Sequence, residues 1–161
     1  MHFDDRLATV LRSRVSGSAT ARIQYRQLLD LLGTLPVEAR SAQVDAACDR
    51  LGELGKAIAP ADRAAMLREP GLRLRNPRLV ALLAGGEEQV AAAAVQRAQL
   101  GEDAWIDLAP ALPAAARGMV RQRRDLGARA EALFDRLGMT LPGLPPVAAP
   151  VAERVPEAAA A

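Results

Sequence analysis

Glycine and proline residues divide the stretch from Asn76 to Leu137 into short segments. Within each segment the apolar residues recur three or four positions apart, which is the spacing of one face of an α-helix. Asn76-Pro77 is typical of a helix start, because asparagine caps free backbone N–H groups and proline has no N–H to leave unpaired. Gly85-Gly86 and Leu100-Gly101 are typical helix ends. The stretch therefore predicts a series of short helices.

The first half of the chain has the same helical character. One apolar stripe begins at Phe3 and Leu7, and a second runs from Ala21 to Leu32. Aromatic residues make up only 2% of the chain, so the core must consist of leucine, valine and alanine, and alanine is the strongest helix former. The sequence predicts an all-α fold, an irregular multi-helix bundle of about eight or nine helices.

Within the segment that follows Pro36, five apolar residues form a heptad-like seam over roughly two heptads. The seam consists of Val44, Ala47, Leu51, Leu54 and Ile58. One interpretation is a long helix packed inside the bundle, and the other is a dimerisation helix. Gly52 and Gly55 weaken the last turns of this helix, and we expect them to let a neighbouring helix come close.

The segments after Pro77 show a predicted apolar helix face and paired carboxylates at predicted helix starts. Leu79, Leu82 and Leu83 are expected to form the apolar face of the helix that begins at Pro77. Paired carboxylates, as in Glu87-Glu88 and Glu102-Asp103, fall at predicted helix starts, where the helix dipole favours negative charge.

Two stretches in the second half resemble each other. AVQRAQLGEDAWIDL at 94–108 aligns with VRQRRDLGARAEALF at 120–134, so that Leu100-Gly101 matches Leu126-Gly127 and Leu108 matches Phe134. Such self-similarity is typical of stacked helical units, each of which buries its apolar face against its neighbours. We therefore predict HEAT-like stacked helix pairs in the second half of the bundle.

The composition changes at about Met139. Five of the eleven prolines fall within the last twenty residues, which are also rich in alanine. This composition is typical of a semi-extended linker. We predict a helical domain at 1–138 and a disordered linker at 139–161 that leads to a further domain beyond Ala161.

No group of residues in the sequence has the pattern of a catalytic, metal-binding or phosphate-binding site. Cys48 is the only cysteine and His2 the only histidine, which leaves neither a disulfide, nor a zinc site, nor a Cys–His pair. No glycine pattern has phosphate-binding spacing. We predict no catalytic, cofactor-binding or metal-binding residue, no cofactor and no enzymatic activity in this chain. A single thiol, no visible signal peptide and no long apolar run favour a cytoplasmic protein without a membrane partner.

An arginine cluster near the C-terminal end is the one candidate interaction face. Arg117, Arg121 and Arg124 are spaced four and three residues apart and would share one helix face. They could bind phosphates or an acidic partner. The alternative is a solvated face, partly compensated by Asp125 and Glu131. No aromatic residue interleaves for base stacking, and the net charge is only +2, so nucleic acid is disfavoured.

Several phrases resemble a known group of proteins. FDDRLATVLR, RQLLDLLGTLP and MLREPGLRLRNPRLVALLAGGEEQVAAAAV resemble the N-terminal region of alphaproteobacterial cytoplasmic sensor histidine kinases. They are also similar to an alphaproteobacterial HEAT-like domain of unknown function. The resemblance spans most of 1–138 and includes no catalytic motif, because the chain has neither a phosphoacceptor histidine followed by an acidic residue nor ATP-binding boxes.

The resemblance implies a non-catalytic helical input or interaction module of a two-component kinase whose core lies beyond Ala161. Its partner would be a protein or a second copy of the chain, and a small-molecule ligand stays open. A stand-alone helical scaffold is the first alternative. Weak nucleic-acid or phosphate binding through the arginines is the second.

Overall fold

The computed structural model describes residues 2–138 and confirms the all-α fold. Nine α-helices and one short 3-10 turn lie within these residues, and a single β-bridge joins Leu74 to Ala98. The helices are α1 (His2–Arg12), α2 (Ser18–Gly33), α3 (Ala42–Lys56), α4 (Pro60–Leu67), α5 (Pro77–Ala84), α6 (Glu88–Arg97), α7 (Glu102–Leu108), α8 (Ala114–Arg121) and α9 (Ala128–Gly138), with the turn η1 (Ala109–Ala111) after α7. The predicted linker at 139–161 lies outside the described residues.

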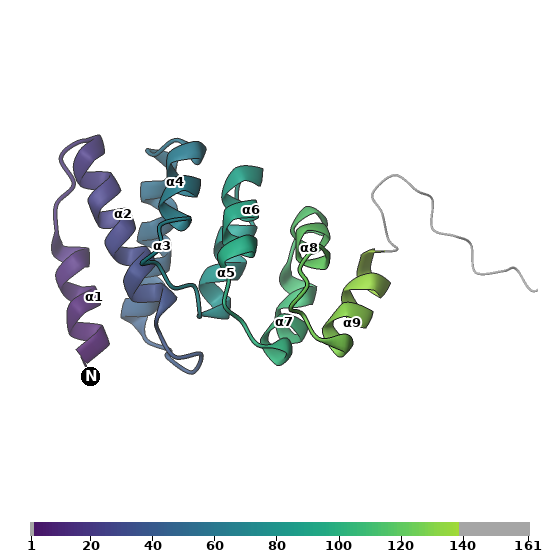
Figure 1. The fold of residues 1–161 in the computed structure, drawn as a ribbon. Coiled ribbons are helices and arrows are strands. Elements are labelled where there is room, and N and C mark those ends of the chain that lie inside the picture. Colours follow the sequence, from purple (N-terminus) through teal and green to yellow (C-terminus); the bar gives the residue numbers. More distant parts are fainter. Residues whose placement is uncertain (1, 139–161) are drawn as a thin grey trace, which may run out of the picture.

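The helices stand side by side in a row that runs from α1 at one end to α9 at the other (Figure 1). One layer of the row contains the stacked neighbours α1 and α3, then α5, α7 and α9, while α4, α6 and α8 stack in the other. Contacts between α5 and α6 and between α8 and α9 join the layers. The second half is therefore built from stacked helix pairs, as its internal similarity predicts.

The heptad-like seam of α3 lies in the core of this single chain. Each of its five side chains is at most 4% exposed, because α2 and α1 pack against α3. The interpretation as a packed bundle helix is therefore confirmed. Dimerisation through this seam is wrong, since the seam offers no free apolar face.

The predicted start of α5 is confirmed, and it fastens two distant parts of the chain. The Asn76 side-chain oxygen accepts hydrogen bonds from the backbone N–H groups of Arg78 (2.9 Å) and Leu79 (3.3 Å). Its amide group donates to the carbonyl of Leu35 at 3.2 Å. Asn76 is only 7% exposed, so this one residue satisfies the free N–H groups of α5 and ties α5 to the end of α2.

An extended segment before α5 holds the two halves of the row together. The Arg75 N–H donates to the Gly33 carbonyl at 2.9 Å, and the Leu74 carbonyl accepts from the Gln99 N–H at 2.7 Å. A side chain at Gly33 would overlap the backbone carbonyl of Arg73. Glycine at the end of α2 therefore allows this backbone-to-backbone contact.

No helix among residues 2–138 has the length and apolar character that crossing a membrane requires.

Candidate binding cleft

The arginine cluster does not form the single helix face that the spacing predicts. Arg117 and Arg121 lie one turn apart on α8, but α8 ends at Arg121 and Arg124 lies in the connection to α9. Just past the helix end the chain turns Arg123 inward, where its side chain is 13% exposed and forms a 2.7 Å ion pair with Asp125. The prediction of a shared face is therefore wrong for Arg124.

The arginines around α8 serve partly as structural ties. Arg121 forms a 3.1 Å ion pair with Asp135 of α9. The Arg123 guanidinium lies 5.1 Å from the centre of the fully buried Trp105 ring and donates to the carbonyl of Val95. Arg123 thus covers the indole as a cation–π partner and joins α6, α7 and the α8–α9 connection. Binding by Arg117, Arg121 and Arg124 stays a prediction.

A cleft between α3 and α5 is the better candidate site. Adjacent helices of their layer pack directly elsewhere in the row, but α3 and α5 do not pack closely. The space between them is a half-open cleft of about 190 Å³. Its lining comes from α3, α5 and the start of α6, and Tyr25 of α2 and Arg63 of α4 lie deeper in it. Five helices therefore meet at one hollow.

Arg63 forms the polar wall of the cleft. Its side chain is 10% exposed, its Nε donates to the Ile58 carbonyl at 3.0 Å, and its Nη2 donates to Glu87 Oε1 at 2.7 Å. Burial is the largest single influence and lowers the pKa of Arg63, but the hydrogen bonds and charges of Glu87 and Tyr25 together outweigh burial, so the pKa is raised. The hydrogen bond from Arg63 in turn lowers the pKa of Glu87. Both groups are charged at neutral pH.

Tyr25 completes this wall. The residue is 2% exposed, and burial raises the pKa of its hydroxyl, an effect that the neighbouring Arg63 charge partly offsets. The phenol is therefore neutral at physiological pH. It lies beside the Arg63 guanidinium on the α2 side and hydrogen-bonds to it.

The two glycines of α3 have different roles. A Cβ atom at Gly55 would lie 3.4 Å from Arg63 Nη1 and 3.7 Å from the Tyr25 ring. The expected close approach of a neighbour is thus confirmed at Gly55. At Gly52 it is wrong, since a Cβ there would meet no atom within 4 Å. Gly52 faces the open cleft.

Two further residues of the cleft differ from their predicted surroundings or were missed. Leu82, expected on the buried face of α5, is 42% exposed and lines the cleft, whereas Leu79 and Leu83 are buried as predicted. Lys56, the only lysine of the chain, lines the cleft from the last turn of α3. The sequence signal that could have identified the site is the pair Gly52 and Gly55, three residues apart, which leaves part of one face of α3 without side chains next to Lys56.

The cleft lining contains no cysteine, serine, threonine or histidine. Cys48 is buried, and burial raises the pKa of its thiol, so it is an inert core residue. Among residues 2–138 no three His, Cys, Asp or Glu side chains gather as metal ligands would. Comparisons with models of protein families, with curated proteins and with solved structures give no match to this chain.

Proposed function

We propose that the chain is a non-catalytic helical interaction module that provides the input part of a two-component sensor histidine kinase. The observation that supports it is the half-open cleft between α3 and α5. It combines an exposed leucine, an exposed lysine and a buried arginine in one hollow. Exposed apolar surface beside fixed polar groups is typical of binding sites rather than of a finished core.

The position of the cleft suggests how binding is transmitted. Besides the hydrogen bonds that Asn76 and Arg75 donate near the end of α2, the first three helices meet the rest of the row through ion pairs, such as Arg22 with Asp62 (α2 to α4) and Arg78 with Asp45 (α5 to α3, 2.6 Å). These pairs are solvent-exposed and individually weak, at roughly 0–1 kcal/mol each. An occupant of the cleft contacts both sides of this boundary. Its binding would therefore bias how the two parts sit against each other.

Site-specific photo-cross-linking tests the interaction. A photoreactive amino acid in place of Leu82 is expected to trap a specific partner in the native cell, and the adduct is expected to disappear when Gly52→Leu fills the cleft. Ile23 is the matched control position, because it is 60% exposed and lies outside the cleft. Equal adducts from positions 82 and 23, or none from position 82, would contradict a docking role for the cleft.

The kinase assignment rests on the sequence resemblance and has its own test. Sequencing of the gene past the Ala161 codon is expected to show a reading frame with a phosphoacceptor histidine and ATP-binding boxes. An immediate stop codon would instead favour the stand-alone scaffold. The cross-linking experiment is informative in either case.

A further inference from the structure

We propose that the α3–α5 cleft binds an aliphatic carboxylate, with the carboxylate at Lys56 and the hydrocarbon part against Leu82. This inference rests on the proposed interaction function and names the chemistry of the occupant. It is drawn from the charges in the cleft, from its apolar lining and from its size.

The charges in the cleft favour an anion. Lys56, Arg63 and Glu87 are the ionisable side chains of the lining besides the neutral Tyr25. Glu87 is already hydrogen-bonded to Arg63 at 2.7 Å. Lys56 takes part in none of the ion pairs formed within residues 2–138. The cleft therefore carries one positive charge that the surrounding side chains do not neutralise.

The arginine adds directional donors to this charge. Nε and Nη2 of Arg63 have their acceptors in Ile58 and Glu87. Nη1 is the guanidinium nitrogen nearest to Gly55, where a Cβ would lie 3.4 Å from it, and the Tyr25 side chain also hydrogen-bonds to this guanidinium. A carboxylate is a small anion that the Lys56 ammonium can bind through a charge-assisted hydrogen bond, with the positive Arg63 guanidinium in the same lining. An occupant with an acidic end is thus favoured over a neutral or basic one.

The remaining lining favours a hydrocarbon body. Leu51, Leu83 and Val90 are each at most 5% exposed and form the floor, and Leu82 stands at the mouth with 42% of its surface open. Covering this exposed leucine removes apolar surface from water, which favours binding of a hydrocarbon group. A purely polar anion such as phosphate would leave the apolar surface of Leu82 exposed to water. The favoured occupant is therefore amphipathic.

The size limits the occupant to a small group. At about 190 Å³, the cleft is smaller than the roughly 300–1,000 Å³ typical of sites for cofactor-sized ligands. A short branched acid fits this description, and so does the last residue of a peptide that ends in leucine. The shared chemistry is a branched aliphatic group next to a carboxylate.

Nuclear magnetic resonance of the full 161-residue chain tests the proposal with 4-methylpentanoate as the probe. Titration is expected to shift the backbone amide signals of Gly52, Gly55 and Gly86 in a saturable way, because these glycines line the cleft. The signals of Gly17 and Gly118, which lie elsewhere, should stay unmoved. The corresponding amide, 4-methylpentanamide, has the same shape without the charge and should bind at least tenfold more weakly.

Two pairs of variants separate the roles of space and charge. Gly52→Leu should abolish the shifts, whereas Gly118→Leu on α8 should leave them unchanged, since a Cβ at either glycine meets nothing within 4 Å. Lys56→Gln should weaken binding roughly tenfold, which corresponds to the loss of one charge-assisted hydrogen bond. Arg124→Gln removes the same charge from a distant position and should have no effect.

A second titration distinguishes the two sources of the carboxylate. If an N-acetylated tripeptide ending in leucine binds more tightly than the free acid, and its C-terminal amide does not, the occupant is a chain end. If the free acid binds more tightly, the occupant is a small organic acid. Absent or unsaturable shifts with both probes would overturn the proposal, as would equal binding of acid and amide or undiminished binding by Gly52→Leu. A cross-link at position 82 would then still support a partner of different chemistry.

Discussion

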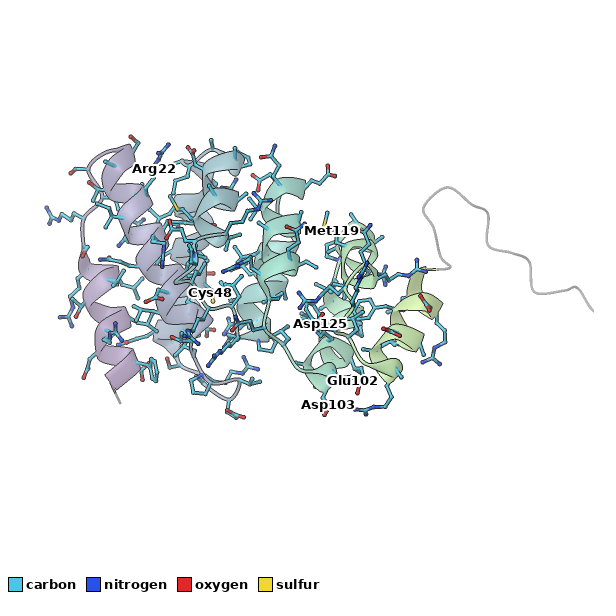
Figure 2. All side chains as sticks on the ribbon, viewed as in Figure 1. Arg22, Cys48, Glu102, Asp103, Met119 and Asp125 are labelled. Carbon is cyan, nitrogen blue, oxygen red and sulfur yellow. The ribbon has the colours of Figure 1, made fainter. Side chains whose placement is uncertain are left out.

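Two junctions between neighbouring helices of the same layer, called joints below, differ in packing. Side chains fill the α7–α9 joint but not the α3–α5 joint. Between α7 and α9 the helices pack directly, and Glu102 and Asp103 lie where the two helices meet (Figure 2). Between α3 and α5 the helices stay apart and leave the cleft. Each joint has a glutamate, an arginine and a glycine near it, so residue types alone do not explain the difference.

The two joints differ in the groups that donate hydrogen bonds to the glutamate side chain, Glu102 at one joint and Glu87 at the other. Glu102 Oε1 accepts hydrogen bonds from the backbone N–H groups of Arg129 (2.8 Å) and Ala130 (3.2 Å), and so caps α9 from α7. These hydrogen bonds lower the pKa of Glu102. Glu87 instead binds the Arg63 side chain of α4, which ties the α5–α6 connection to the other layer. The carboxylate at the filled joint thus caps the neighbouring helix of its own layer, whereas the carboxylate at the open joint is bound to a side chain of the other layer.

The largest expected difference between the joints concerns their apolar side chains. Phe134 of α9 is fully buried, and Phe134→Ala should lower the free energy of unfolding by about 3–5 kcal/mol through lost burial and a cavity. Leu82→Ala at the open joint should change it by no more than about 0.5 kcal/mol, as for most surface positions. Denaturant unfolding measures both. Similar losses would mean that the cleft is closed in solution.

Glycine substitutions should have opposite signs at the two joints. Gly127 has a φ of +85°, and a Cβ there would lie 2.5 Å from Glu102 Oε1, so Gly127→Ala should cost about 1–3 kcal/mol. Gly52→Ala meets open space and removes a flexible residue from a helix, so it should stabilise the protein by up to about 1 kcal/mol. Thermal unfolding of both variants measures the signs. A destabilising Gly52→Ala would show that this position is already packed.

The smallest effect concerns pH at the open joint. The hydrogen bond from Arg63 lowers the pKa of Glu87 in the folded state, so the pair contributes stability above the ordinary glutamate value of about 4.3. That contribution is lost as the pH falls through the lowered value of the folded state. Because half of the Glu87 side chain is exposed, we expect less than about 1 kcal/mol. Unfolding curves from pH 7 to pH 3 should show a shallower decline for Glu87→Gln, and parallel curves would argue against the ion pair.

Local rules predicted the helices well but not the space between them. Asn76 and Pro77 mark a helix start in any context, since capping depends on adjacent backbone groups. The spacing of Leu79, Leu82 and Leu83 places them near one face, but it cannot say that α3 stops short of covering Leu82. Likewise, the spacing of Arg117, Arg121 and Arg124 assumes a continuous helix, but α8 ends at Arg121 and the chain then places Arg123 over Trp105. Both outcomes depend on distant partners.

The central claim is that the hollow between α3 and α5 is a binding site, and a crystal structure of the full chain grown with 4-methylpentanoate tests it most directly. We expect the acid between the two helices, with its carboxylate within hydrogen-bonding distance of Lys56 Nζ and its branched end against Leu82. An empty hollow at saturating acid, or α3 packed against α5 with Leu82 buried between them, would contradict the claim.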